Sequence, residues 1–144
     1  MDTKIFLDTG GLIALAVQED QSHKQALRSF DEIVREGCQL FTTEYVLEEL
    51  VTWFRYKSKY TIPEIFQFLH NLYIKDLNVI EVGRDRFGNA LILMHKFQDQ
   101  YFSMTDCVSF VVMKELKIND SFTTDKHFTI AGFNNLLEQD LWQK

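Results

Sequence analysis

The segment KIFLDTGGLIALAV, residues 4–17, is apolar up to Asp8, is interrupted at Gly10 and Gly11, and is then apolar again. Residues 5–7 have the length and composition of a short buried strand. A carboxylate at the end of such a strand is costly to bury unless it is paired or binds a metal. Asp8 therefore either caps the helix that follows it or belongs to a functional site.

Three enzyme chemistries use an aspartate in this setting. Asp8-Thr9-Gly10 is the signature of aspartic proteases, and phosphatases of the haloacid dehalogenase type and certain metal-dependent nucleases carry an aspartate after their first strand. Aspartic proteases are almost entirely β, whereas most of this chain has helical patterns. The phosphatases need a second acid two residues after the nucleophile, and position 10 is glycine. The nuclease is therefore the better fit.

Short apolar strands alternate with amphipathic helices along the chain. Strands are predicted at residues 5–7, 39–41, 77–82, 122–123 and 135–137, and helices are predicted to start near residues 10, 22, 43, 61, 87 and 103. Ser22 with Gln25 resembles a capping box at the start of the second helix. The alternation predicts one α/β domain, residues 1–144, with a central parallel sheet whose ligands gather at the carboxyl ends of the strands.

Charge and composition exclude several classes of protein. A net charge of −6 argues against a general nucleic-acid binder, but not against an enzyme that concentrates carboxylates in one metal-binding cleft. Cys38 and Cys107 form no CxxC pair, which indicates reduced cysteines rather than a zinc site. The sequence has no signal-peptide pattern and no stretch of about 20 apolar residues, so we expect a cytoplasmic protein without a membrane span.

Four acidic residues stand out by their positions relative to the predicted elements. Asp8 and Asp125 directly follow strands, whereas Glu49 and Asp106 lie in early turns of helices that begin just after the same edge of the sheet. Three of them also have a structural alternative. Asp8 could cap the next helix, Asp125 could cap a turn, and Asp106 could be the third-position acid of a capping box that begins at Ser103.

Glu48 and Glu49 are adjacent, and only one of them is expected to face the sheet. Val46 and Trp53 lie three and four residues from Glu49, so this side chain is on the apolar shoulder of the helix. Glu48 has Glu44 on its side and is nearer the polar face. We therefore expect Glu49, rather than Glu48, to take part in a site.

The order and setting of these acids resemble those of the PIN-domain ribonucleases, particularly VapC-like toxins of bacterial and archaeal toxin–antitoxin pairs. The resemblance covers nearly the whole chain. It is carried by FLDTGGLIAL (6–15), DQSHKQAL (20–27), TTEYVLEEL (42–50), FSMTDCVSFVVMKEL (102–116) and SFTTDKHF (121–128). Many relatives have a small polar residue at the position of Gly10. The glycine is expected to loosen the turn after Asp8 and to remove a hydroxyl near the metal.

The resemblance implies a three-layer α/β/α sandwich with a central, mostly parallel sheet of four or five strands. It implies that Asp8, Glu49, Asp106 and Asp125 form one acidic cleft of catalytic, metal-binding residues. Mg²⁺ is the expected cofactor and Mn²⁺ a possible substitute, because both take oxygen ligands and stabilise charge during phosphodiester hydrolysis. Asp8 is expected as the central ligand, Asp106 as a second ligand, and Glu49 and Asp125 as ligands through water or of a second ion.

Further residues could orient a ligand or touch the substrate. They are Thr9, Ser103, Thr105, Lys126 and His127. Ordinary structural roles compete with these assignments, since Ser103 could simply cap its helix and the side chains of Lys126 and His127 could simply be solvated.

The function implied by the resemblance is that of a metal-dependent endoribonuclease, the toxin of a toxin–antitoxin pair, with RNA as substrate and a cognate antitoxin as partner. Three alternatives stay open: a catalytically silent PIN-like module that binds RNA or protein, a PIN nuclease of RNA processing outside a toxin–antitoxin pair, and a DNA-directed nuclease of similar fold. We also expect a homodimer, because residues 105–116 are apolar nearly all round and residues 53–60 are rich in aromatics.

Overall fold

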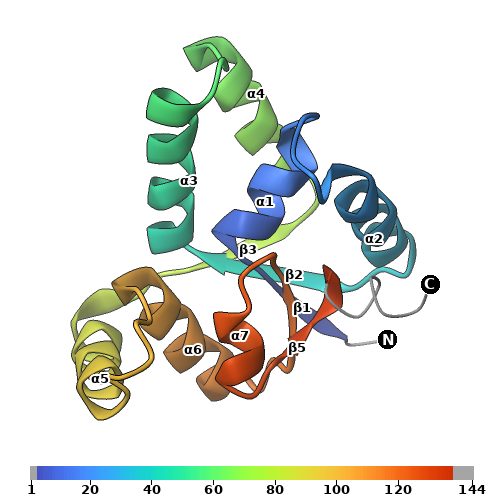
Figure 1. Ribbon diagram of the computed structural model, residues 1–144. Helices are drawn as coiled ribbons and strands as arrows, with labels where there is room; N and C mark the ends of the chain where they lie inside the picture. Colours follow the sequence, from blue (N-terminus) through green and yellow to red (C-terminus); the bar gives the residue numbers. More distant parts are fainter. Residues whose placement is uncertain (1–2, 138–144) are drawn as a thin grey trace.

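A parallel sheet of five strands forms the centre of the computed structural model, which describes residues 3–137 (Figure 1). The strands are β1 (Lys4–Leu7), β2 (Gln39–Thr43), β3 (Leu77–Ile80), β4 (Asp120–Phe122) and β5 (Asn134–Asn135). Their order is β3-β2-β1-β4-β5, and each neighbouring pair is parallel. The prediction of a mostly parallel sheet with four or five strands is confirmed.

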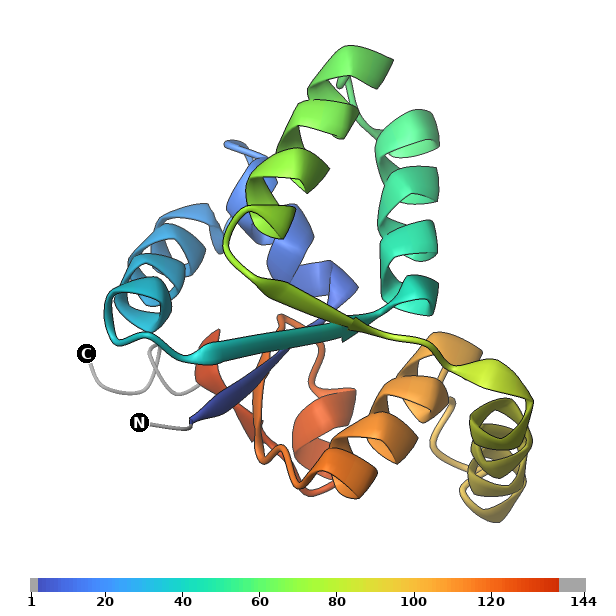
Figure 2. The same ribbon diagram turned by 180° about the vertical axis from the view of Figure 1, so that it is seen from behind.

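Helices cover both faces of this sheet, which makes three layers (Figures 1 and 2). On one face lie α1 (Thr9–Ala16), α2 (His23–Arg35), α3 (Glu44–Lys57) and α4 (Ile62–Tyr73). On the other lie α5 (Gly83–Lys96), α6 (Met104–Leu116) and α7 (His127–Ile130). Within residues 3–137, none of the helices combines the length and the apolar character that a membrane crossing requires.

Side-chain caps fix where several helices begin. The hydroxyl of Thr43 accepts a hydrogen bond of 3.2 Å from the backbone N–H of Val46, and Thr61 and Glu64 form a reciprocal capping box. The capping box predicted at residue 22 is wrong, because the side chain of that serine makes no cap hydrogen bond. Gln25 is instead buried and donates its amide N–H to the backbone carbonyl of Leu137.

Helix α6 is apolar on most sides because it lies between the sheet and α5. Seven of its residues are buried, among them Phe110 and Met113, and α5 packs along it. This burial removes α6 as the reason for expecting a dimer. Large apolar side chains are exposed on α4 instead, where Ile62, Phe66 and Tyr73 are each more than half exposed.

Candidate metal centre

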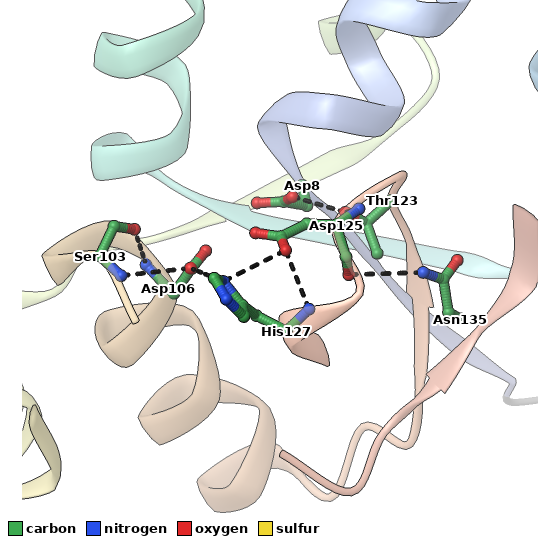
Figure 3. A network of polar contacts seen from close by, with 7 residues as sticks. All are labelled: Asp8, Ser103, Asp106, Thr123, Asp125, His127 and Asn135. Atoms are coloured by element: carbon green, nitrogen blue, oxygen red, sulfur yellow. Dashed lines mark hydrogen bonds and ion pairs between the residues drawn. The ribbon is translucent and has the colours of Figure 1, made fainter. Parts of the chain in front are cut away.

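Three chain segments meet at the carboxyl edge of the sheet. The register pairs Leu7 of β1 with Phe122 of β4, so the residues that follow the two strands lie side by side. The backbone N–H of Asp8 donates to the carbonyl of Phe122 over 3.1 Å. The amino terminus of α6 brings Asp106 to the same place, and the segment after β4 brings Asp125 (Figure 3).

Asp8 is almost fully buried, with 4% of its surface exposed. Its Oδ2 accepts a 2.7 Å hydrogen bond from the hydroxyl of Thr123. It occupies the N-cap position of α1, but its side chain makes no cap hydrogen bond, so the capping alternative is wrong. Burial raises the pKa of Asp8 to about 7, helped by the nearby charges of Asp106 and Asp125 and opposed by the hydrogen bond from Thr123. This carboxyl group is therefore held where its own ionisation is unfavourable.

Asp106 serves two purposes at once. It closes a capping box, since its backbone N–H donates to the Ser103 hydroxyl over 3.0 Å and its Oδ2 accepts from the Ser103 backbone N–H over 3.3 Å. The same Oδ2 lies 3.4 Å from Nδ1 of His127. Burial, followed by the charge of Asp125, raises the pKa of Asp106 to about 6. The capping role is confirmed, and it holds this carboxylate in a fixed position at the sheet edge.

Asp125 is held by its neighbours on the loop after β4. Its Oδ1 accepts a 2.9 Å hydrogen bond from the backbone N–H of His127, which confirms the predicted turn cap. Its own backbone N–H donates to the hydroxyl of Thr123 over 2.9 Å, and its carbonyl accepts from the Asn135 amide over 3.4 Å. Nδ1 of His127 lies 3.3 Å from Asp125 Oδ1.

Two carboxylate oxygens and one imidazole nitrogen come together in this region. One donor atom each from Asp106, Asp125 and His127 lies within 4.8 Å of the others, and the carboxylate of Asp8 is directed toward the same space (Figure 3). Hard divalent cations take oxygen ligands, and imidazole nitrogen adds affinity for first-row transition metals. The donor set therefore fits a divalent metal ion, and such an ion would relieve the repulsion among the carboxylates.

Glu49 is on α3 and is hydrogen-bonded to the residue that follows Asp8. Glu49 is half-buried, whereas Glu48 is exposed. The prediction that Glu49, rather than Glu48, lies on the apolar shoulder of the helix is therefore confirmed. Oε1 of Glu49 accepts a 2.6 Å hydrogen bond from the hydroxyl of Thr9. Among residues 3–137, the cluster of donor atoms that could share one ion includes neither Glu49 nor Asp8.

The remaining predicted residues are placed as follows. The hydroxyl of Thr9 contacts Glu49, Ser103 caps α6, Thr105 is half-buried in the first turn of α6, Lys126 is exposed, and His127 is part of the donor cluster. Sequence reasoning missed Thr123, whose hydroxyl donates to Asp8 and accepts from the backbone of Asp125. A hydroxyl two residues before an acid that follows a strand is the signal that could have identified it.

The two glycines after Asp8 let α1 approach β4 closely. A Cβ at Gly11 would lie 2.3 Å from the carbonyl oxygen of Phe122, a backbone atom that cannot easily move. A Cβ at Gly10 would lie 2.5 Å from the hydroxyl of Thr124, a side-chain atom. Gly10 is inside the first turn of α1. The expectation that it loosens a turn after Asp8 is therefore wrong: the residue makes room for the loop after β4.

Comparison with known proteins gives a match in structure alone. No protein-family model matches the chain, and no curated protein matches it. Among solved structures it is similar to VapC20 of Mycobacterium tuberculosis, described as a toxin that cleaves the sarcin–ricin loop. The TM-score is 0.73 at 23% sequence identity, over 90% of this chain and 95% of that one. The chain therefore has the PIN-like α/β fold that its sequence predicted.

Proposed function

We propose that this chain is a metal-dependent endoribonuclease that hydrolyses RNA phosphodiester bonds, and that it is the toxin of a toxin–antitoxin pair. One observation carries the proposal: Asp8, Asp106 and Asp125 converge at the carboxyl edge of a PIN-like sheet. The RNA-cleaving toxin of the same fold supports RNA as the substrate class. Residues 1–144 would then form one nuclease domain.

The acids of the site would hold the cofactor, Mg²⁺ with Mn²⁺ as a substitute. When bound, the ion supplies positive charge for the phosphate oxygens and activates the attacking water. Asp106 and Asp125 would bind it, and Asp8, which follows the neighbouring strand β1, would add a third carboxylate. Thr123 orients two of these groups with one hydroxyl, because it donates to Asp8 and accepts from the backbone of Asp125.

We assign Glu49 a catalytic role without direct contact to the principal ion. Its carboxylate accepts a hydrogen bond from the hydroxyl of Thr9, the residue directly after Asp8. It can hold a water or a second ion on the α3 side of the cleft, and it fixes the first turn of α1 through Thr9. Lys126 is exposed and lies between Asp125 and His127 in the sequence, and it would contact the substrate phosphate.

Cleavage of labelled RNA by the purified protein tests the proposal. We expect cleavage with Mg²⁺ or Mn²⁺, none after EDTA, and none by an Asp8→Asn or Asp106→Asn variant. Glu48→Gln is the matched control, because Glu48 is an exposed acid on the same helix as Glu49, and it should retain full activity. Equal cleavage by wild type and Asp8→Asn would mean a contaminating nuclease. Saturable metal binding without any cleavage would favour the silent binding module.

We further propose a cytoplasmic homodimer that is neutralised by a cognate antitoxin. Free Cys38 and Cys107 suit a reducing compartment. The exposed apolar side chains of α4 offer an interface to a partner or a second copy, and the acidic cleft suits a basic side chain of an inhibitor. Light scattering at micromolar concentration should report a dimer, and a monomer would contradict that part of the proposal.

A further inference from the structure

We propose that the ring of His127 is a direct ligand of the metal ion, and that this nitrogen makes the site select first-row transition-metal ions over Mg²⁺. The inference rests on the proposed function, since it takes the carboxyl edge of the sheet as a metal centre. The inference goes beyond the proposed function because it changes the ligand set from oxygen alone to oxygen and nitrogen. It also changes the expected cofactor from Mg²⁺ to a metal such as Mn²⁺.

The spacing of the donor atoms supports direct ligation. Nδ1 of His127 lies 3.4 Å from Oδ2 of Asp106 and 3.3 Å from Oδ1 of Asp125. Neighbouring ligands of one small divalent ion, at bond lengths of about 2.0–2.3 Å, lie roughly 3.0–3.5 Å apart. The two pairs that include the ring nitrogen therefore have the separations that a shared ion requires, and the carboxylate oxygens of Asp106 and Asp125 lie within 4.8 Å of each other.

The ring is also fixed in this orientation by contacts that do not involve a metal. The backbone N–H of His127 donates to Asp125 Oδ1 over 2.9 Å, which ties the residue to the carboxylate. The ring packs edge-on against Phe102, with 5.3 Å between ring centroids. About a quarter of the side chain is exposed. A ring held in this way loses little conformational freedom when it binds an ion.

The chemistry of the donors then sets the selectivity. Mg²⁺ prefers oxygen ligands in strict octahedral geometry and keeps several waters. Imidazole nitrogen favours transition metals, whose affinity for a given site rises from Mn²⁺ toward Cu²⁺. Mn²⁺ is the weakest binder of that series, so it gives the most demanding test. A site that prefers Mn²⁺ to Mg²⁺ because of one nitrogen will prefer the later ions as well.

A competing role for His127 is that of a cation paired with Asp106 and Asp125 in place of the metal. The two roles differ in what Mn²⁺ touches once it is bound. Electron spin echo measurements on Mn²⁺ detect directly bonded nitrogen, and selective ¹⁵N labelling of histidine identifies its source. The chain has four histidines. His70, exposed near the end of α4, provides the matched control variant.

We expect nitrogen coupling to Mn²⁺ in the wild-type protein and in His70→Gln, its isotope shift after ¹⁵N-histidine labelling, and its loss in His127→Gln. By calorimetry, His127→Gln should weaken Mn²⁺ binding by at least about tenfold, because loss of even an indirect metal contact costs 10- to 100-fold. Mg²⁺ binding should change by less than roughly threefold, since Mg²⁺ gains little from nitrogen. If His127→Gln folds poorly, the labelled wild type still shows whether a histidine is bound, and persistence of that coupling in His23→Gln, His70→Gln and His95→Gln assigns it to His127.

Two negative results have different meanings. Mn²⁺ that binds saturably to the wild type without histidine nitrogen coupling would overturn this inference and leave the proposed nuclease intact. No saturable binding of Mn²⁺ or Mg²⁺ would overturn the metal centre itself, and with it the proposed function. Equal weakening of both ions in His127→Gln would show that the residue only supports the site and does not select the metal.

Discussion

Replacing Asp8 by Asn removes a charge at nearly constant side-chain shape. The replacement should therefore raise the free energy of unfolding of the metal-free protein, by an amount that depends on pH. Burial raises the pKa of Asp8 to about 7 from an ordinary value of 3.8. Between these two values the folded protein binds one more proton than the unfolded chain. The free energy of unfolding of the wild type should therefore fall as the pH rises through this window, by about 1.4 kcal/mol per pH unit.

The gain in Asp8→Asn follows from that slope. Because the pKa of Asp8 is raised by roughly three units, its ionised carboxylate destabilises the wild type by at most about 4 kcal/mol, and this maximum is reached above about pH 7. The Asn carbonyl can still accept from Thr123, but its buried amide N–H groups have no assured partner, at a cost of about 1–3 kcal/mol. We expect Asp8→Asn to be more stable than wild type by about 1–3 kcal/mol above pH 7. Near pH 4 it should be no more stable or slightly less stable, because folded wild-type Asp8 then carries its proton.

Urea unfolding with EDTA at about pH 4.5, 6 and 8 measures the effect. Glu48→Gln, at an exposed acid, is the matched control and should change the free energy of unfolding at pH 8 by much less than Asp8→Asn does. Adding Mn²⁺ or Mg²⁺ should stabilise wild type by mass action and Asp8→Asn much less. A difference between wild type and Asp8→Asn that is the same at all three pH values would refute the reasoning, as would an equal response of both proteins to metal.

Three further predictions concern the supports of the site. Gly11→Ala should lower the free energy of unfolding by about 1–3 kcal/mol, because its Cβ meets a backbone oxygen. Gly10→Ala should be close to neutral, because its Cβ meets a side-chain hydroxyl instead. Urea unfolding that ranks the two variants in the reverse order would contradict the packing described. Ser103→Ala should cost about 1 kcal/mol by removing the cap of α6, and unchanged stability would mean that the cap is dispensable. Thr123→Val should raise the pKa of Asp8 further, moving the fall in stability to higher pH; an unchanged pH profile would exclude this hydroxyl as its stabilising partner.

Local chemistry made much of this fold predictable. Hydroxyl side chains that can cap a helix predicted three of the helix starts, and the structure has all three caps, at Thr43, Thr61 and Ser103. Ser22 has the same pattern but no cap, because its backbone is not extended, its N–H donates to Asp20 Oδ1, and the side chain of Gln25 is hydrogen-bonded to a distant carbonyl. Capping residues compete with tertiary hydrogen bonds, and the latter are invisible in a local pattern. The four-residue helix α7 was missed, since one turn carries no detectable periodicity.

The candidate site was predictable in its acids and less so in its geometry. Asp8 and Asp125 follow neighbouring parallel strands, and that placement can be inferred from the alternation of elements. The sequence could not show that Glu49 accepts a hydrogen bond from the hydroxyl of Thr9, because this depends on how α3 is rotated against α1. It also could not show that His127 points its Nδ1 at two carboxylates, which is set by the turn after β4.

The central claim is that the carboxyl edge of the sheet is a divalent metal centre. Anomalous diffraction from a crystal soaked in Mn²⁺ tests it most directly, because the signal locates the ion without assuming its ligands. The claim predicts a peak between the side chains of Asp106, Asp125 and His127, facing Asp8, and loss of that peak in Asp106→Asn. A well-ordered crystal with no peak there, or a peak that persists in Asp106→Asn, would contradict it.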